Sequence, residues 1–233
     1  MPAESKVALV AALEREVHPL VKTWRRVECE HDGRHFRFYE SDHAVLVCGG
    51  IGGQAARRAT EAVIALYHPQ MVRSVGFAGA LDPAMMVGEV VCPSSIIDAR
   101  DGSRTETGSG RGILVTTASV ASPQEKKRLA QTYQAQAVDM EAAAVARGAQ
   151  VRGIAVAATK AISDTASFAL PAMDRFVDAS GRFQTGKFVL HCALRPWLWA
   201  GIIQLARNSA TASRALCAEL ERSLDLPAGM TEH

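Results

Sequence analysis

Two short segments with carboxylates decide how this chain is expected to fold: VDMEAAA at residues 138–144 and AISD at residues 161–164. Each follows an apolar run typical of a strand and stands where that strand gives way to a helix or a loop. Glu16 lies in a comparable position after the first apolar run. Ligands of open α/β sheets bind beyond the carboxyl ends of the strands. We therefore expect Glu16, Glu141 and Asp164 to converge on one crevice.

Apolar runs alternate with amphipathic stretches along the rest of the chain, a pattern that predicts a sheet covered by helices. We expect one α/β domain over residues 1–233, with a mixed, largely parallel sheet flanked by helices and a helical C-terminal extension at 168–233. The expected strands cover 7–13, 44–48, 71–77, 88–92, 113–117, 135–140 and 153–162, and the expected helices cover 14–26, 53–68, 122–135 and 141–150. Residues 34–48 read as a hairpin, and 98–112 as an exposed loop.

Composition excludes several classes of protein. The 233 residues are 48% hydrophobic and 21% charged, with a net charge of +2 and no basic run, so no nucleic-acid partner is expected. Five cysteines without a C-x-x-C pair, and an N-terminus without a signal sequence, favour a cytoplasmic protein. Motifs for zinc ligation, a nucleophilic serine or a Walker A loop do not occur, so no metal and no cofactor are expected.

Two glycine-containing segments lie near the carboxylates in the expected sheet. The run GGIGGQA at 49–55 follows a strand and opens a helix, so its N–H groups could hold an anion. It also matches G-x-G-x-x-A, but it is not the first strand-to-helix turn and lacks the acidic partner of a dinucleotide site. The run GFAGAL at 76–81 reads as a second turn at the same edge. In each segment the alternative is that the small residues bind no ligand and only allow a helix to pack closely against the sheet.

Five segments in order carry a resemblance to a known family: AALEREV at 11–17, GIG at 50–52, GFAGAL at 76–81, VDMEA at 138–142 and AISD at 161–164. Together they resemble the purine nucleoside phosphorylase superfamily, and within it the methylthioadenosine/adenosylhomocysteine nucleosidases most of all. The resemblance runs from about Lys6 to Ala166. It implies a nucleoside phosphorylase-like fold, a nucleoside substrate and a homo-oligomer.

The resemblance also implies roles for single residues. Met140 and Glu141 would lie under the ribose, where the carboxylate accepts hydrogen bonds from the sugar hydroxyls. Glu16 would activate the attacking water, and Asp164 would protonate or hydrogen-bond purine N7 as the base leaves. The further substrate-binding positions are Gly52, Ala78, Gly79 and Ser163. Taken singly, each carboxylate could instead be a first-turn or capping residue of a helix.

The nucleophile is left open by the residues, because the superfamily contains both hydrolases and phosphorylases. Glu16 favours water, since a carboxylate about 4 Å from a phosphate charge costs on the order of 4 kcal/mol at an effective dielectric near 20. Inorganic phosphate would be the co-substrate of a phosphorylase, with Arg15, Arg57 and Lys160 as compensating cations. The sequence departs from the nucleosidase pattern at Phe77, at Lys160 and at residues 115–120, which lack an aromatic side chain.

The C-terminal third extends beyond the usual end of a small nucleosidase. Its segments at 170–176, 181–183 and 193–209 resemble the superfamily members associated with hopanoid biosynthesis, which implies adenosylhopane, a lipid-linked adenosine, as substrate. The apolar run at 197–206 is too short to span a bilayer. We expect Trp197, Leu198 and Trp199 to form a hydrophobic substrate wall or a peripheral membrane contact. A core or subunit-contact helix is the alternative.

Overall fold

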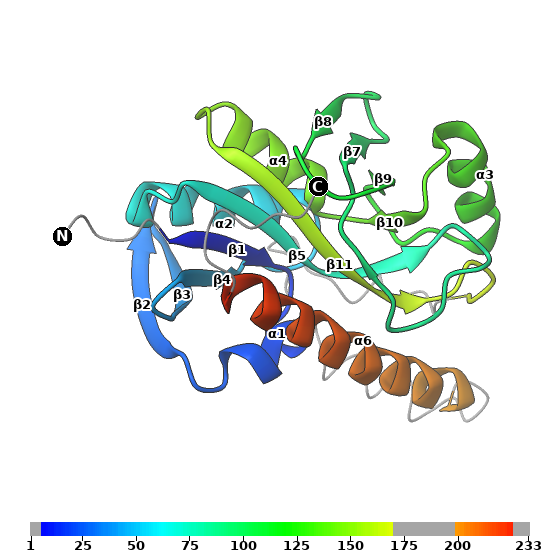
Figure 1. Ribbon diagram of the computed structural model, residues 1–233, viewed down its shortest axis with the longest axis horizontal. Coiled ribbons are helices and arrows are strands. Elements are labelled where there is room, and N and C mark those ends of the chain that lie inside the picture. Colours follow the sequence, from blue (N-terminus) through cyan, green and yellow to red (C-terminus); the bar gives the residue numbers. More distant parts are fainter. Residues whose placement is uncertain (1–5, 170–198, 226–233) are drawn as a thin grey trace.

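The computed structural model describes residues 6–169 and 199–225 (Figure 1). Strands and helices follow one another in the order β1 (Val7–Ala11), α1 (Glu14–Val21), β2 (Arg25–His31), β3 (Arg34–Glu40), β4 (Ala44–Cys48), α2 (Gly53–Tyr67), β5 (Met71–Ala80), β6 (Val90–Val91), β7 (Ser95–Asp98), β8 (Arg104–Glu106), β9 (Ile113–Thr116), α3 (Pro123–Tyr133), β10 (Ala137–Asp139), α4 (Ala142–Gln150), β11 (Ala155–Asp164) and α6 (Trp199–Asp225). Within these residues no helix is long and apolar enough to cross a membrane.

All the described strands belong to one mixed sheet, in the order β2-β3-β4-β1-β5-β10-β9-β7-β8, with β11 paired to β5 and β6. The centre is parallel, since β1 pairs with β4 and β5 in parallel and β11 runs parallel to the whole length of β5. Antiparallel pairs lie at the β2-β3-β4 edge, at β7-β8, and where β10 meets the end of β5. The predicted mixed α/β class is therefore confirmed.

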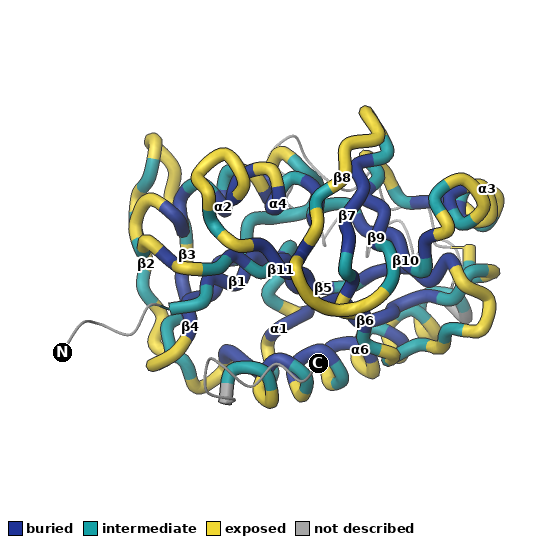
Figure 2. Tube along the Cα trace, turned by 45° about the horizontal axis from the view of Figure 1, so that its top comes forward, coloured by how far each residue is buried: buried dark blue, intermediate teal, exposed yellow. Residues whose placement is uncertain are grey.

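Helices cover both faces of the sheet (Figure 1). On one face α2 and α4 bury small and branched side chains such as Ala59, Val63 and Val145 against the strands. On the other face α1 and α6 pack together, and Val17 and Leu216 are fully buried between them and the sheet. Burying these apolar faces is the main term that holds the layers together. Figure 2 shows the buried central strands beneath the exposed outer turns of the helices.

The N-terminal edge of the sheet differs from the prediction. A helix was expected over 14–26, but α1 ends at Val21 and Arg25–His31 forms β2. The segment RRVECEH alternates exposed and half-buried positions, which suits an edge strand with one face toward solvent. The hairpin from β2 to β3 turns at Asp32 and Gly33, both with positive φ. Such a two-residue turn matches the right-handed twist of the strands.

Further expectations are corrected. Residues 76–81 do not form a turn, because β5 continues to Ala80 and pairs with β11 through this segment. The exposed loop expected over 98–112 contains the short strand β8. Strand β7 was not predicted, and the strand expected over 88–92 is reduced to β6. The 34–48 hairpin forms as predicted, and Ser122 and Glu125 make the capping box that starts α3.

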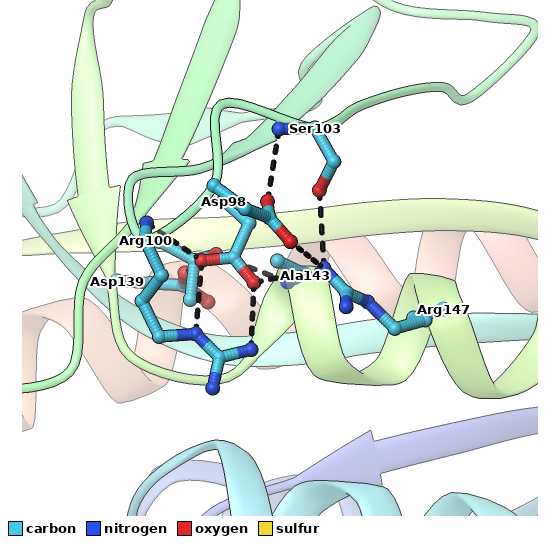
Figure 3. Close-up of polar contacts among 8 residues, drawn as sticks. Asp98, Arg100, Ser103, Asp139, Ala143 and Arg147 are labelled. Atoms are coloured by element: carbon cyan, nitrogen blue, oxygen red, sulfur yellow. Dashed lines mark hydrogen bonds and ion pairs between the residues drawn. The ribbon is translucent and has the colours of Figure 1, made fainter.

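A polar network fastens the end of β7 to α4 (Figure 3). Arg147 of α4 points toward Asp98 and Asp101, with N···O distances of 3.2 and 2.8 Å, and donates to the Ser103 hydroxyl at 3.1 Å. Arg100 also pairs with the carboxylate of Asp98 at 3.0 Å. The network holds α4 against this part of the sheet. This matters because Glu141 immediately precedes α4.

Candidate active site

Glu16 occupies the first turn of α1 and is only 6% exposed. Its carboxylate accepts a hydrogen bond of 3.3 Å from the N–H of Leu13 and lies against the backbone of β5. A Cβ on Gly76 would stand 2.8 Å from Glu16 Oε2, so a glycine is needed here. Burial raises the pKa of Glu16, and the nearby positive charge of Lys160 partly offsets that rise. A base with a raised pKa is suited to proton transfer near neutral pH.

Glu141 is the residue before α4, directly after β10. Its carboxylate accepts one hydrogen bond of 2.7 Å from the N–H of Gly52 and one of 3.3 Å from the N–H of Met140. Burial, followed by repulsion from Asp139, raises the pKa of Glu141 to about 7. The glycine-rich loop predicted to hold an anion therefore holds the carboxylate of Glu141.

Lys160 and Asp139 form a buried ion pair beneath these carboxylates, with 2.8 Å between Lys160 Nζ and Asp139 Oδ2. Asp139 also accepts from the Thr116 hydroxyl at 2.6 Å and from the N–H of Ala142 at 2.9 Å. Burial acts to lower the pKa of Lys160, but the charges of Asp139, Glu141 and Glu16 outweigh it, so the pKa is raised. The Lys160 ammonium thus contacts Asp139 and interacts electrostatically with Glu141 and Glu16 as well.

Asp164 is the last residue of β11 and is 3% exposed. The register with β5 shifts between Ile162 and Asp164, so Ser163 forms a bulge and donates to Asp164 Oδ1 at 2.8 Å. The other oxygen, Oδ2, pairs with the ammonium of Lys126 from α3. The charged group in contact with the Asp164 carboxylate is therefore a lysine.

The carboxylates of Glu16, Asp139, Glu141 and Asp164 belong to residues that line one cavity of about 150 Å³. Among the predicted site residues, its wall contains Glu16, Ala78, Gly79, Met140, Glu141, Ser163 and Asp164. Gly52 reaches the site through its hydrogen bond to Glu141. The loop after β9 and helix α6 contribute Thr117, Ser119, Val120, Leu205 and Ser209. The structure brings the three predicted carboxylates together, and their roles remain predictions.

The structure describes only part of the segment predicted to form a hydrophobic wall. Trp197 and Leu198 lie outside the described residues, as does the side chain of Trp199, although its backbone begins α6. Leu205 does line the cavity, while Ile203 on the same helix is 51% exposed. The apolar run is therefore not buried all round in this chain.

Lys126 and Asp139 are the polar groups that sequence reasoning passed over. Lys126 precedes Leu129 by three residues, so both lie on the buried face of α3, and Lys126 is 1% exposed. A lysine at a position that helical periodicity places toward the core was the available signal, since lysine is almost never fully buried unless paired. Asp139 lies in the VDMEAAA segment, but no role was predicted for it. Its partner Lys160 stands mid-strand, where only the register of β11 with its neighbours reveals it.

Comparison with known proteins identifies the family and the fold. The family model described as "Phosphorylase superfamily" matches residues 6–114 and 109–186. The 5′-methylthioadenosine/S-adenosylhomocysteine nucleosidase of Staphylococcus epidermidis is 24% identical over 69% of this chain and 87% of its own length. The same enzyme of Marinomonas is 29% identical over 40% of this chain, but the match spans only 42% of that protein.

Solved structures share the fold. The nucleosidase of Colwellia psychrerythraea, in complex with adenine, superimposes with a TM-score of 0.61 at 21% identity, over 70% of this chain and 83% of that chain. Futalosine hydrolase of Helicobacter pylori has a TM-score of 0.68 at 18% identity, over 94% of this chain and 98% of that chain. The family model matches well over half of the sequence, and this chain belongs to the phosphorylase superfamily.

Proposed function

We propose that this protein is an enzyme that hydrolyses the N-glycosidic bond of a 5′-modified adenosine and releases adenine. The observation that carries the proposal is that Glu16, Glu141 and Asp164 line one small cavity although they come from helix α1, from the residue before α4 and from the end of β11. Cleavage of such a bond passes through a sugar with oxocarbenium character. Carboxylates arranged around the sugar stabilise that positive charge.

The three groups divide the chemistry between them. Glu141 accepts hydrogen bonds from the ribose hydroxyls, and Glu16 takes a proton from the attacking water. The Asp164 side of the cavity receives the base, whose departure requires a hydrogen bond or a proton at the ring. The similarity to nucleosidases over 87% of the Staphylococcus epidermidis protein supports this assignment.

Water is favoured over phosphate as the nucleophile. On the sugar side of the cavity the charge of Lys160 interacts with those of Glu16, Asp139 and Glu141, so three carboxylates stand against Lys160 and Arg15, which also lines the cavity. A phosphate dianion placed there would be repelled at short range. The raised pKa of Glu16 also matches the work of a general base.

Adenosylhopane is the leading substrate. The C-terminal segments resemble the hopanoid-associated members of the family, and α6 supplies Leu205 and Ser209 to the cavity. A lipid at the 5′ carbon would need an apolar exit, and Leu205 and the exposed Ile203 on α6 suit one. A peripheral membrane contact and a homo-oligomer belong to this proposal.

The second candidate is hydrolysis of methylthioadenosine or adenosylhomocysteine. It is favoured by the named activity of the curated relatives, and it would make the C-terminal helix merely structural. A module that binds nucleosides without cleaving them is a further alternative, and the presence of Glu16, Glu141 and Asp164 in one cavity argues against it.

Adenine release decides between these functions. The protein is incubated with adenosylhopane and with methylthioadenosine, each with and without inorganic phosphate. The sugar product is then identified by its mass in a mass spectrometer. Adenine and free ribosylhopane in both buffers are expected. A phosphate requirement would contradict hydrolysis, and turnover of methylthioadenosine alone would favour the second candidate. No adenine from either nucleoside would contradict enzymatic cleavage.

A further inference from the structure

Lys126 is the least expected polar group in the cavity. It lies in the first turns of α3, is 1% exposed, and is among the residues that line the cavity wall. Its ammonium pairs with Asp164 Oδ2 and donates to the carbonyl oxygen of Thr165 at 2.8 Å. A lysine ammonium carries three N–H donors. Two have partners among the described residues, which leaves one for whatever occupies the cavity.

We propose that Lys126 is the proton donor to the leaving base, and that Asp164 acts as its carboxylate partner. This inference rests on the proposed function and changes which atom supplies the proton. Adenine presents a ring nitrogen acceptor, N7, beside an exocyclic amino donor, N6–H₂. The Lys126 ammonium and the Asp164 carboxylate form the complementary pair, a donor next to an acceptor.

The surroundings of Asp164 support this division. Ser163 donates to Oδ1 at 2.8 Å and Lys126 occupies Oδ2, so both oxygens already accept hydrogen bonds. Asp164 is the acceptor in both of these contacts, whereas the Lys126 ammonium is a donor that carries three N–H groups. The available proton at this end of the cavity is therefore on Lys126 Nζ.

The proposed step balances as follows. The bond from C1′ to N9 breaks, and its electron pair enters the purine ring. A proton passes from Lys126 Nζ to N7, which leaves a neutral amine beside the Asp164 carboxylate. Water oxygen bonds to C1′ and gives a proton to Glu16. Proton exchange with solvent then restores the ammonium and the Glu16 carboxylate.

Two substitutions at Lys126 separate proton donation from charge. Lys126→Met removes both, whereas Lys126→Arg keeps the charge on a guanidinium that does not give up its proton in proteins. Lys127→Met is the matched control, because Lys127 is the exposed neighbour in the same helix. Two substrates are compared: whichever 5′-modified adenosine the wild type cleaves, and 4-nitrophenyl riboside, whose leaving group departs as an anion without a proton.

We expect both Lys126 variants to release adenine at least about 100-fold more slowly, the size typical of a lost general acid. Release of 4-nitrophenolate should stay within about threefold of wild type, and Lys127→Met should change neither rate. Full adenine release by Lys126→Arg would overturn the proposal, since charge alone would then suffice. Equal loss with both substrates would also overturn it, because Lys126 would then only maintain the site.

Folding and function have their own controls. Thermal unfolding shows whether Lys126→Met, which leaves Asp164 without its cation, still folds. If it does not, Lys126→Arg carries the test alone. A wild type that releases neither adenine nor 4-nitrophenolate would overturn the proposed function and this inference together. If the wild type is active and the Lys126 variants lose both rates equally, this inference is overturned while the proposed function stands.

Discussion

The N–H of Gly52 donates a hydrogen bond of 2.7 Å to the carboxylate of Glu141, across 89 residues of sequence. Gly52 has a φ of 91°, a conformation that side-chain-bearing residues rarely adopt. The loop after β4 and the start of α4 are thereby joined at the floor of the cavity. Glu141 is held by backbone donors, which place its oxygens without competing for the side chains around them.

A methyl group at Gly79 should disturb the base side of the cavity. A Cβ there would lie 2.8 Å from Asp164 Oδ2 and 3.1 Å from Lys126 Cε. We expect Gly79→Ala to lower kcat/KM for adenine release by about 10-fold or more, and to cost about 1–3 kcal/mol of unfolding free energy through overpacking. Steady-state kinetics and urea unfolding measure the two effects.

Gly201→Ala is the control for that substitution. No atom of the described residues lies within 4 Å of the Cβ that it adds, and Gly201 is inside helix α6. It should leave activity unchanged and stabilise the protein by about 0.5–1 kcal/mol. Equal behaviour of the two variants would contradict the steric argument at Gly79.

Removal of the base at position 16 should slow the chemical step. Glu16→Gln keeps the size of the side chain and an acceptor for the Leu13 N–H, which the Glu16 carboxylate now accepts at 3.3 Å. We expect kcat to fall by about 100-fold to 10,000-fold, while adenine affinity stays nearly constant. Rapid-quench kinetics and calorimetric titration with adenine test this. An unchanged kcat would exclude Glu16 as the base.

The activity should rise with pH in a window around 7. In the proposed function Glu141 accepts hydrogen bonds from both ribose hydroxyls, which requires its ionised form, and burial raises its pKa to about 7. Below that pH the carboxyl is protonated, so kcat/KM should decline as pH falls from 8 to 6. Asp139→Asn removes a repulsive charge and should move this limb to lower pH. If the acidic limb of the kcat/KM profile does not move in Asp139→Asn, a group other than Glu141 is responsible for it.

The same carboxylate should cost stability. In the folded protein the pKa of Glu141 rises from 4.5 to about 7, so the folded state binds the proton more tightly. The stability that this tighter proton binding contributes is fully present below pH 4.5 and is lost as pH rises through 7. Glu141→Gln should therefore increase the free energy of unfolding at pH 8 by about 1–3 kcal/mol, with water in the cavity limiting the gain. At pH 4 the difference should vanish.

The convergence of Glu16 and Asp164 was predictable, because β1 and β11 run parallel to β5 and place their carboxyl ends at one edge of the sheet. Glu141 was predicted at the same site, but it follows β10, which pairs with the end of β5 in an antiparallel manner, so this rule does not explain its position. Helices α2 and α3 were also predictable from apolar periodicity and, for α3, its capping box. Strand β2 was missed, since a charged edge strand has little apolar signal. The segment at 76–81 was mistaken for a turn, because glycines in a strand resemble a turn until a neighbouring side chain explains them.

The sequence by itself determined the alternation of strands and helices, the family, and the three carboxylates at the strand ends. Only the tertiary structure decided their charged partners. Lys160 pairs with Asp139 from a neighbouring part of the sheet, and Lys126 reaches Asp164 from a helix 38 residues away. Local pattern encodes which face of an element is buried, whereas an ion pair depends on how two elements are placed in space. Packing, not periodicity, therefore decides which lysine meets which carboxylate.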